Sequence, residues 1–214
     1  MIRALVLALA LGAASAFTPA QVPAARSAAL NSVSERLAEG AMPPTGFFDP
    51  WGFYESGTES TNAWFRAAEL KHGRVCMAAF TGFLVQSAGI HFPGALDMSG
   101  KQFSDMPVDP AAAWGALSWE GQMQIIGFIG FVEFHSELRK PHVLSGGIPG
   151  KIDPMLPGKL WDPLGMVAGL SEEKKAVQRT KEIANSRAAM LGMMGILASY
   201  NIPDSVPMQF LPTV

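Results

Sequence analysis

The sequence predicts an all-α membrane protein with three transmembrane helices, the first and third related by a pseudo-two-fold axis along the membrane normal. Three observations lead to this fold class: three long segments without proline, an internal repeat, and a one-sided distribution of basic residues. The 214-residue chain is 49% hydrophobic and only 16% charged, whereas a typical soluble domain carries about 25% charged residues. A net charge of -2 without a basic stripe argues against a nucleic-acid-binding protein, and a single cysteine excludes a disulfide scaffold.

Three segments are predicted to be helices, at residues 62–90, 118–138 and 174–200. None contains proline, while several prolines interrupt both intervening segments. At about 1.5 Å per residue, each helix is long enough to cross about 30 Å of hydrocarbon, although the uninterrupted apolar runs are shorter than the roughly 18 residues that would identify a span alone. The mean hydropathy of +0.20 fits a few membrane helices joined by polar loops.

The N-terminus has the pattern of a targeting region. A positive segment ending at Arg3, an apolar segment over residues 4–11 and Ala14-Ser15-Ala16 follow the order of a signal peptide and its cleavage site. We therefore assign residues 1–16 to a signal peptide. Residues 18–30 contain serine, arginine and many alanines but no acid, which is typical of a plastid transit peptide, with plain secretion as the alternative. We expect residues 17–40 to be removed at least in part and residues 41–214 to form the three-helix domain.

The sequence repeats itself at an offset of 113 residues. The loop Asp49-Pro50-Trp51-Gly52 returns as Asp162-Pro163-Leu164-Gly165, and the motif Glu69-Leu70-Lys71-His72-Gly73-Arg74 returns as Glu182-Ile183-Ala184-Asn185-Ser186-Arg187. The first helix follows one copy and the third helix the other. Because one crossing separates them, the two helices run in the same direction and are related by an axis along the membrane normal.

Basic residues indicate the orientation in the membrane. Residues 139–181 hold eight of the sixteen lysines and arginines, whereas residues 90–117 hold only Lys101 and residues 201–214 hold none. Three crossings place the N-terminal segment and the second loop on one side, which is therefore the basic side, as the positive-inside rule requires.

The charged residues within the first and third helices need partners, because ionisable groups in a bilayer are costly. Under two-fold symmetry, Glu69 faces Arg187 and Glu182 faces Arg74, so that each carboxylate is neutralised by the other helix. Small residues that would let the two backbones approach closely are Gly73, Ala79, Gly82, Gly192 and Gly195.

A carboxylate paired with arginine keeps lone pairs that can bind a metal. Glu69 and Glu182 each offer such oxygens, and His72 and Asn185, three residues further on, offer a nitrogen and a carbonyl oxygen. These ligands are single and separated along the helices. They suit a magnesium ion already held by a macrocycle, which needs one axial ligand, better than a free ion.

These motifs resemble those of the light-harvesting chlorophyll-binding proteins. The resemblance covers about residues 47–198 and rests on the two Glu-to-Arg motifs, the two D-P-x-G loops and His91-Phe92-Pro93-Gly94. Residues 124–131 together with Glu133 look like the middle helix of the fucoxanthin chlorophyll a/c group.

The resemblance implies a set of pigment-binding residues. The axial chlorophyll ligands would be Glu69, His72, Glu182 and Asn185, with Gln124 and Glu133 on the middle helix, and the ion-pair partners would be Arg74 and Arg187. The carotenoid loops would be formed by Asp49, Pro50, Gly52, Asp162, Pro163 and Gly165. Hydrogen bonding between helices is an equal alternative for Gln124. Ser199 stands where many family members have a further glutamine ligand.

The implied function is a light-harvesting antenna without enzymatic activity. The cofactors would be chlorophyll a, chlorophyll c and fucoxanthin or a related xanthophyll, and the partners a photosystem I or II core, other light-harvesting subunits and the lipid membrane. The implied location is the thylakoid of an alga with a secondary plastid, with the N-terminus and second loop on the stromal side. A photoprotective member of the same family is the alternative. A membrane di-iron enzyme is a distant one, because Glu-x-x-His is half of its motif but the second copy has asparagine.

Overall fold

The computed structural model describes residues 39–138, 140–151, 166, 169–202 and 205–206. Its helices are α3 (Phe53–Ser56), α4 (Glu59–Ser87), α5 (Pro110–Ala116), α6 (Trp119–Glu137) and α7 (Glu172–Asn201), with 3-10 turns η1 (Phe103–Asp105) and η2 (Val143–Ser145). The predicted all-α class is confirmed. The three long predicted helices correspond to α4, α6 and α7, with every end within three residues of its predicted position.

Side-chain caps explain where the long helices begin. The Thr58 hydroxyl accepts a hydrogen bond from the Thr61 N–H at 3.3 Å, so α4 begins three residues before the predicted start. Ser118 and Ser171 cap α6 and α7 in the same way. At the other end of α4, Gly89 has a φ of 71°, a left-handed conformation that glycine adopts without strain and that commonly ends helices.

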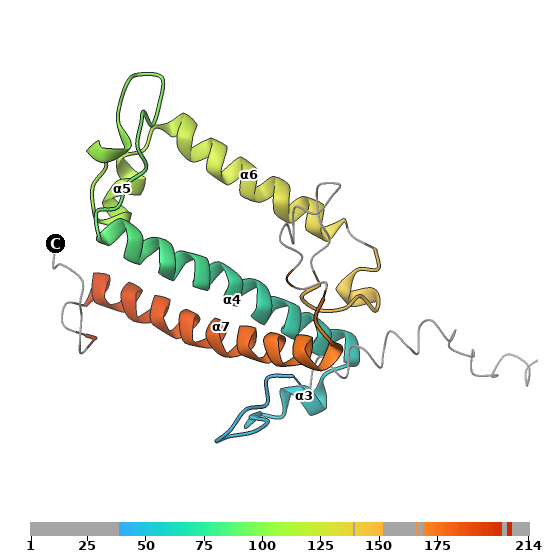
Figure 1. Ribbon diagram of the computed structural model, residues 1–214. Helices are drawn as coiled ribbons and strands as arrows, with labels where there is room; N and C mark the ends of the chain where they lie inside the picture. The colour runs from blue at the N-terminus through green and yellow to red at the C-terminus, as the bar shows by residue number, and fades with distance from the viewer. Residues whose placement is uncertain (1–38, 139, 152–165, 167–168, 203–204, 207–214) are drawn as a thin grey trace, which may run out of the picture.

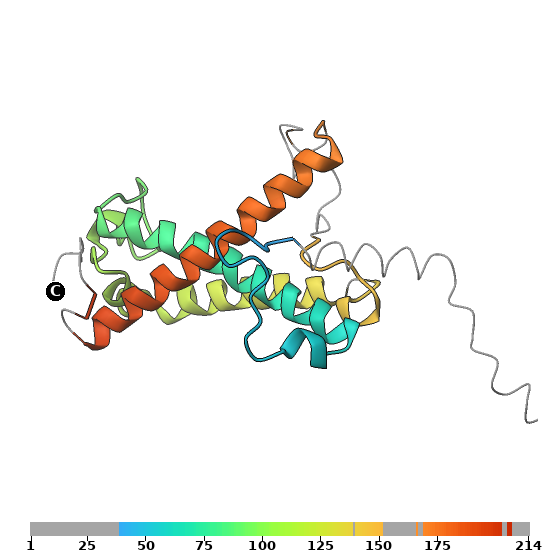
Figure 2. The same ribbon diagram turned by 90° about the horizontal axis from the view of Figure 1, so that it is seen from below.

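Helices α4 and α7 form the packed centre of the structure. They lie side by side in Figure 1 and cross as an X in Figure 2. The residues buried between them include three pairs at the repeat offset of 113, namely Leu70 and Ile183, Gly73 and Ser186, and Phe83 and Ile196. Positions that are equivalent in the repeat are therefore equivalent in burial as well.

The helices come closest where Gly73 meets Ser186. Ser186 is fully buried, and a Cβ atom added to Gly73 would collide with its side chain and lie 3.2 Å from its Cα atom. Contact between equivalent residues is what a two-fold relation would produce. The axis itself, and its direction relative to the membrane, stay predictions.

Away from this crossing, two of the expected small residues do not lie at the interface between the helices. Among the described residues, no atom outside the adjoining backbone of its own helix lies within 4 Å of a Cβ atom built on Gly82. For Gly195 the nearest such atom belongs to Val206, at 3.8 Å. Gly192 faces the Phe80 ring, 3.1 Å from a Cβ atom built on it. The expectation was wrong for Gly82 and Gly195 because the helices diverge from the crossing, which limits backbone contact to the region of Gly73.

Helix α6 lies on one side of the α4–α7 pair and the segment of residues 39–52 lies on the other, as Figure 1 shows. No residue of α6 is buried, and the Phe128 side chain near its middle is 68% exposed. This apolar surface is therefore left uncovered by the described protein residues.

Hydropathy does not identify a membrane span in the described part of the chain, where no helix combines sufficient length with sufficient apolar character. In α4 the last charged residue is Arg74, and in α7 it is Arg187, and each lies just past the middle of its helix. The uncharged segment that follows each arginine is short. The three predicted spans stay a prediction.

Candidate functional site

Two ion pairs join α4 and α7 on either side of their crossing. Arg74 Nε donates to Glu182 Oε1 at 2.6 Å, and Arg187 Nε donates to Glu69 Oε1 at 2.7 Å. Both the Arg74 and the Glu182 side chains are 29% exposed. These are the two crossed pairs that the repeat predicts, and each one neutralises a carboxylate with a cation from the other helix.

The same two arginines also bind the loops that cover the helix pair. Arg187 Nη1 donates to the Gly40 carbonyl oxygen, and Arg74 Nη2 donates to the Gly150 carbonyl oxygen, both at 2.9 Å. Gly40 and Gly150 have φ angles of 94° and 70°, which a residue with a Cβ atom rarely adopts. The loop that contains Gly40 and the loop that contains Gly150 therefore bind the two arginines in the same manner.

An N-terminal residue adds a contact that has no counterpart in the repeat. The Glu39 carboxylate accepts two hydrogen bonds at its Oε1 atom from Arg179, at 2.9 Å from Nε and 2.6 Å from Nη2. The Glu39 carbonyl oxygen accepts a further hydrogen bond from Arg66 at 2.9 Å. Glu39 and Gly40 belong to residues 17–40, the segment that the sequence predicts to be removed at least in part. Gly40 and Gly150 lie 110 residues apart, so the ungapped repeat could not reveal that they are equivalent.

His72 and Asn185 project from the pair of helices and are exposed. The His72 Nδ1–H donates to the Ala68 carbonyl oxygen at 2.8 Å. A carbonyl oxygen only accepts, so the neutral ring keeps its lone pair on Nε2, and a histidine that binds a metal is commonly oriented in this way. The Asn185 side chain has no hydrogen-bond partner among the described residues.

The carboxylates differ in how many of their oxygens are engaged. Glu69 uses both, since Arg187 binds Oε1 and Arg66 binds Oε2 at 2.5 Å. Glu182 uses only Oε1, which leaves Oε2 without a hydrogen bond among the described residues. Of the two carboxylates, Glu182 therefore has the more available oxygen.

The two predicted ligands on α6 have different surroundings. Gln124 is exposed and makes no hydrogen bond with the described residues, so the structure does not show the interhelical bond that was its alternative role. Glu133 Oε2 accepts a hydrogen bond from Lys71 Nζ at 2.7 Å. His142, at the start of the next loop, donates from Nε2 to Glu137 at 2.7 Å.

The first D-P-x-G loop is a structured turn. The Asp49 carboxylate accepts hydrogen bonds from the N–H groups of Phe53 at 3.1 Å and Tyr54 at 2.7 Å, which starts α3, and Gly52 has a φ of 67°. A shallow cavity of about 200 Å³ lies against this loop, lined by Phe47, Phe48, Asp49, Phe53, Tyr54, Asn62, Phe65, Arg66 and Glu69. The residues of the second loop, Asp162, Pro163 and Gly165, lie outside the described residues.

Ser199 does not offer a ligand group to the outside. Its side chain is buried, and its hydroxyl donates to the Ile196 carbonyl oxygen at 2.7 Å within the same helix. The residue that stands in place of glutamine at this position is thus bonded to its own helix.

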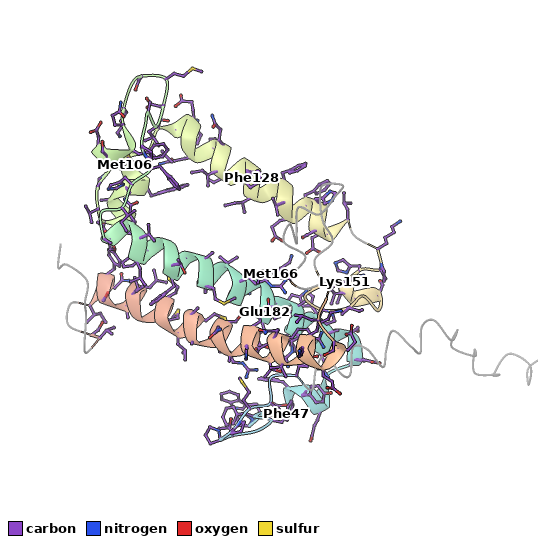
Figure 3. All side chains as sticks on the ribbon, viewed as in Figure 1. Phe47, Met106, Phe128, Lys151, Met166 and Glu182 are labelled. Carbon is purple, nitrogen blue, oxygen red and sulfur yellow. The ribbon has the colours of Figure 1, made fainter. Side chains whose placement is uncertain are left out.

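Across the described residues, no three His, Cys, Asp or Glu side chains gather closely enough to hold a metal ion together. The available donors instead stand singly on the outside of a neutralised helix pair, and Figure 3 shows Glu182 at the crossing of that pair. This arrangement defines an all-α protein whose donor side chains stand singly along its helices.

The chain belongs to the chlorophyll a/b-binding protein family, whose model matches residues 33–201. It is 37% identical to fucoxanthin-chlorophyll a-c binding protein F of Phaeodactylum tricornutum, over 90% of this chain and 92% of the relative. It is 36% identical to the fucoxanthin-chlorophyll a-c binding protein of Trieres chinensis, over 94% of this chain and 96% of the relative. A relative from Macrocystis pyrifera is 34% identical over 81% of this chain and 78% of its own length.

Proposed function

We propose that the chain is a light-harvesting antenna protein of the plastid, which binds chlorophyll a, chlorophyll c and fucoxanthin and passes excitation energy to a photosystem. One observation carries this proposal. On α4 and α7, arginines neutralise the carboxylates, and the side chains that could bind a metal stand one at a time on the outer surface of the helix pair. The bound pigments would supply light absorption and excitation transfer, whereas the protein fixes their positions. An absorption spectrum of the purified protein tests the proposal. Chlorophyll bands support it, and a colourless, iron-containing protein would support the enzyme alternative instead.

The donor groups fit the axial position of chlorophyll magnesium. His72 presents a neutral imidazole nitrogen, Asn185 an amide oxygen and Glu182 a carboxylate oxygen whose charge Arg74 compensates. Each is a single ligand that leaves no uncompensated charge in a region of low dielectric constant. Gln124, on the exposed surface of α6, would act in the same way.

The proposal includes insertion in the thylakoid membrane through α4, α6 and α7, with the N-terminal segment and second loop on the stromal side. At about 1.5 Å per residue, the 19 residues of α6 extend over about 28 Å. The relatives in Phaeodactylum and Trieres are chloroplastic by name. Because Glu39 and Gly40 bind Arg179 and Arg187, we propose that removal of the targeting segment stops before Glu39.

Replacing His72 with leucine is expected to remove one chlorophyll from each chain. Among the described residues the side chain makes one hydrogen bond, to its own helix, and it is exposed, so that its loss leaves the helix pair intact. The chlorophyll-to-protein ratio after reconstitution measures the effect. His91→Leu, in a loop beyond α4, is the matched control and should keep the full ratio. An unchanged ratio in His72→Leu would exclude this residue as a ligand.

The end of α7 is attached to the start of α5 through Asp109. Its carboxylate accepts hydrogen bonds from the Tyr200 hydroxyl and from the Ala112 N–H, the latter at 2.8 Å. The Tyr200 hydroxyl holds the pKa of Asp109 below its ordinary value of 3.8. Because the folded pKa is lower than the unfolded one, this contact stabilises the fold above the unfolded pKa and is lost only as the pH falls through the folded pKa.

Asp109 is therefore expected not to act as a sensor of mild acid, which bears on the photoprotective alternative. Asp109→Asn should leave the pH dependence of the pigment fluorescence yield unchanged between about pH 5 and 8. A yield that falls on acidification in the parent protein but not in Asp109→Asn would contradict this expectation and favour the photoprotective role.

A further inference from the structure

Lys71 connects α4 to α6 by two ion pairs. Its Nζ atom lies 2.7 Å from Glu133 Oε2 and 2.7 Å from Glu137 Oε1. Lys71 lies within the repeated motif, but its charge is not repeated, because Ala184 occupies the equivalent position in α7. Its role must therefore be sought in α6, whose residues are nowhere buried in the described structure.

The two carboxylates that Lys71 binds are not equivalent. Glu137 has both oxygens engaged, since Lys71 binds Oε1 and His142 binds Oε2 at 2.7 Å. Because the Leu144 N–H donates to His142 Nδ1, the proton of the neutral ring is on Nε2 and points toward Glu137. In Glu133 only Oε2 is engaged by Lys71, and Oε1 has no hydrogen-bond partner among the described residues.

Glu133 thus has the same arrangement as Glu182. In each, one oxygen binds a cation from another helix, Lys71 or Arg74, while the second oxygen stays available. A carboxylate without such a cation is costly at membrane depth, and a metal-binding side chain is commonly fixed by a hydrogen bond of this kind.

We propose that Lys71 is the positioning residue that compensates the charge of Glu133 and fixes its carboxylate as an axial chlorophyll ligand on α6. This inference rests on the proposed function. It assigns the ligand role to Glu133 and not to Glu137, and it makes Lys71 the residue through which α4 orients a pigment on α6.

The test compares reconstituted variants by their chlorophyll-to-protein ratio and their visible circular dichroism. Lys71→Met and Glu133→Ala should each lose one chlorophyll, and the same one, as judged by the same missing dichroism band. Lys71→Arg should keep it, because the cation is retained. Lys175→Met is the matched control, since it removes a lysine from an ion pair with Glu172 that involves no proposed ligand, and it should keep every chlorophyll.

A double variant shows whether Lys71 compensates the charge of Glu133 or only bridges α4 and α6. Lys71→Met with Glu133→Gln should regain the chlorophyll, because a glutamine oxygen can ligate magnesium and needs no cation. If Lys71 merely held α6 in place, the glutamine substitution would not restore chlorophyll binding. A double variant that does not regain the chlorophyll therefore overturns the proposal. Full binding in Lys71→Met, or a loss of more than one chlorophyll there, overturns it as well. If the parent protein binds no chlorophyll, the proposed function fails. If the parent protein binds chlorophyll but the Lys71 variants do not show the expected chlorophyll ratios, only this inference fails.

Discussion

Gly73→Ala is expected to destabilise the helix pair by about 1–3 kcal/mol, the usual cost of overpacking a tight contact. The added Cβ atom would occupy the space of the buried Ser186 side chain, and the Ser186 backbone behind it leaves no room to move. Thermal unfolding followed by helical circular dichroism measures the change. The chlorophyll-to-protein ratio should fall as well, because the ligands on both helices depend on this crossing.

Gly82→Ala, in the same helix, is the matched control. Apart from the adjoining backbone of its own helix, no described residue lies within 4 Å of a Cβ atom at that position. The substitution therefore changes mainly the helix propensity, which favours alanine by up to about 1 kcal/mol. The two alanine substitutions should therefore shift the unfolding temperature in opposite directions. Equal shifts would show that the crossing does not depend on Gly73.

An exchange of the two residues tests the equivalence of their positions. In the variant Gly73→Ser with Ser186→Gly, the serine returns to the contact from the other helix, and most of the lost stability should be recovered. Gly73→Ser alone should be at least as damaging as Gly73→Ala. An exchange that is no better than Gly73→Ser alone would mean that the two sides of the crossing are not equivalent.

The sequence was most informative where the repeat holds without a gap. The offset of 113 residues places Glu69 against Arg187 and Glu182 against Arg74, and it also relates the buried residues Leu70 and Ile183. Parallel helices with equivalent sequences bury equivalent positions, so a pattern along the chain carries information about contacts between distant residues.

Features outside the repeat could not be predicted in this way. Lys71 has no charged equivalent, and Glu39 belongs to a segment that reads as a targeting sequence. The position of the helix contact could not be predicted from the glycines either, because a small residue permits two helix backbones to approach closely but does not require it. Gly73 lies at the crossing and Gly82 on an open surface, and only the divergence of the two helices decides between them.

The cross-helix ion pairs give the second large effect. Glu182→Ala leaves the partly buried guanidinium of Arg74 without its carboxylate, and Arg74→Leu leaves Glu182 uncompensated and removes the hydrogen bond to Gly150. Each single change is expected to cost about 1–3 kcal/mol, because a partly buried charged group loses its hydrogen-bond partner. Unfolding temperatures and chlorophyll ratios of the two single variants measure these losses.

The double variant Glu182→Ala with Arg74→Leu should be better tolerated than the sum of the single changes, because no charge is then stranded between the helices. A coupling of about 0.5–3 kcal/mol is usual for residues in contact. The pair Glu172–Lys175 provides the control cycle, because its residues lie three apart in one helix and its glutamate side chain is 83% exposed. Its coupling should be no more than about 0.5 kcal/mol. If the two cycles gave equal coupling, the crossed pairs would be ordinary surface contacts. A larger coupling for Arg74 and Glu182 would show that charge neutralisation at the crossing stabilises the helix pair on which the proposed ligands stand.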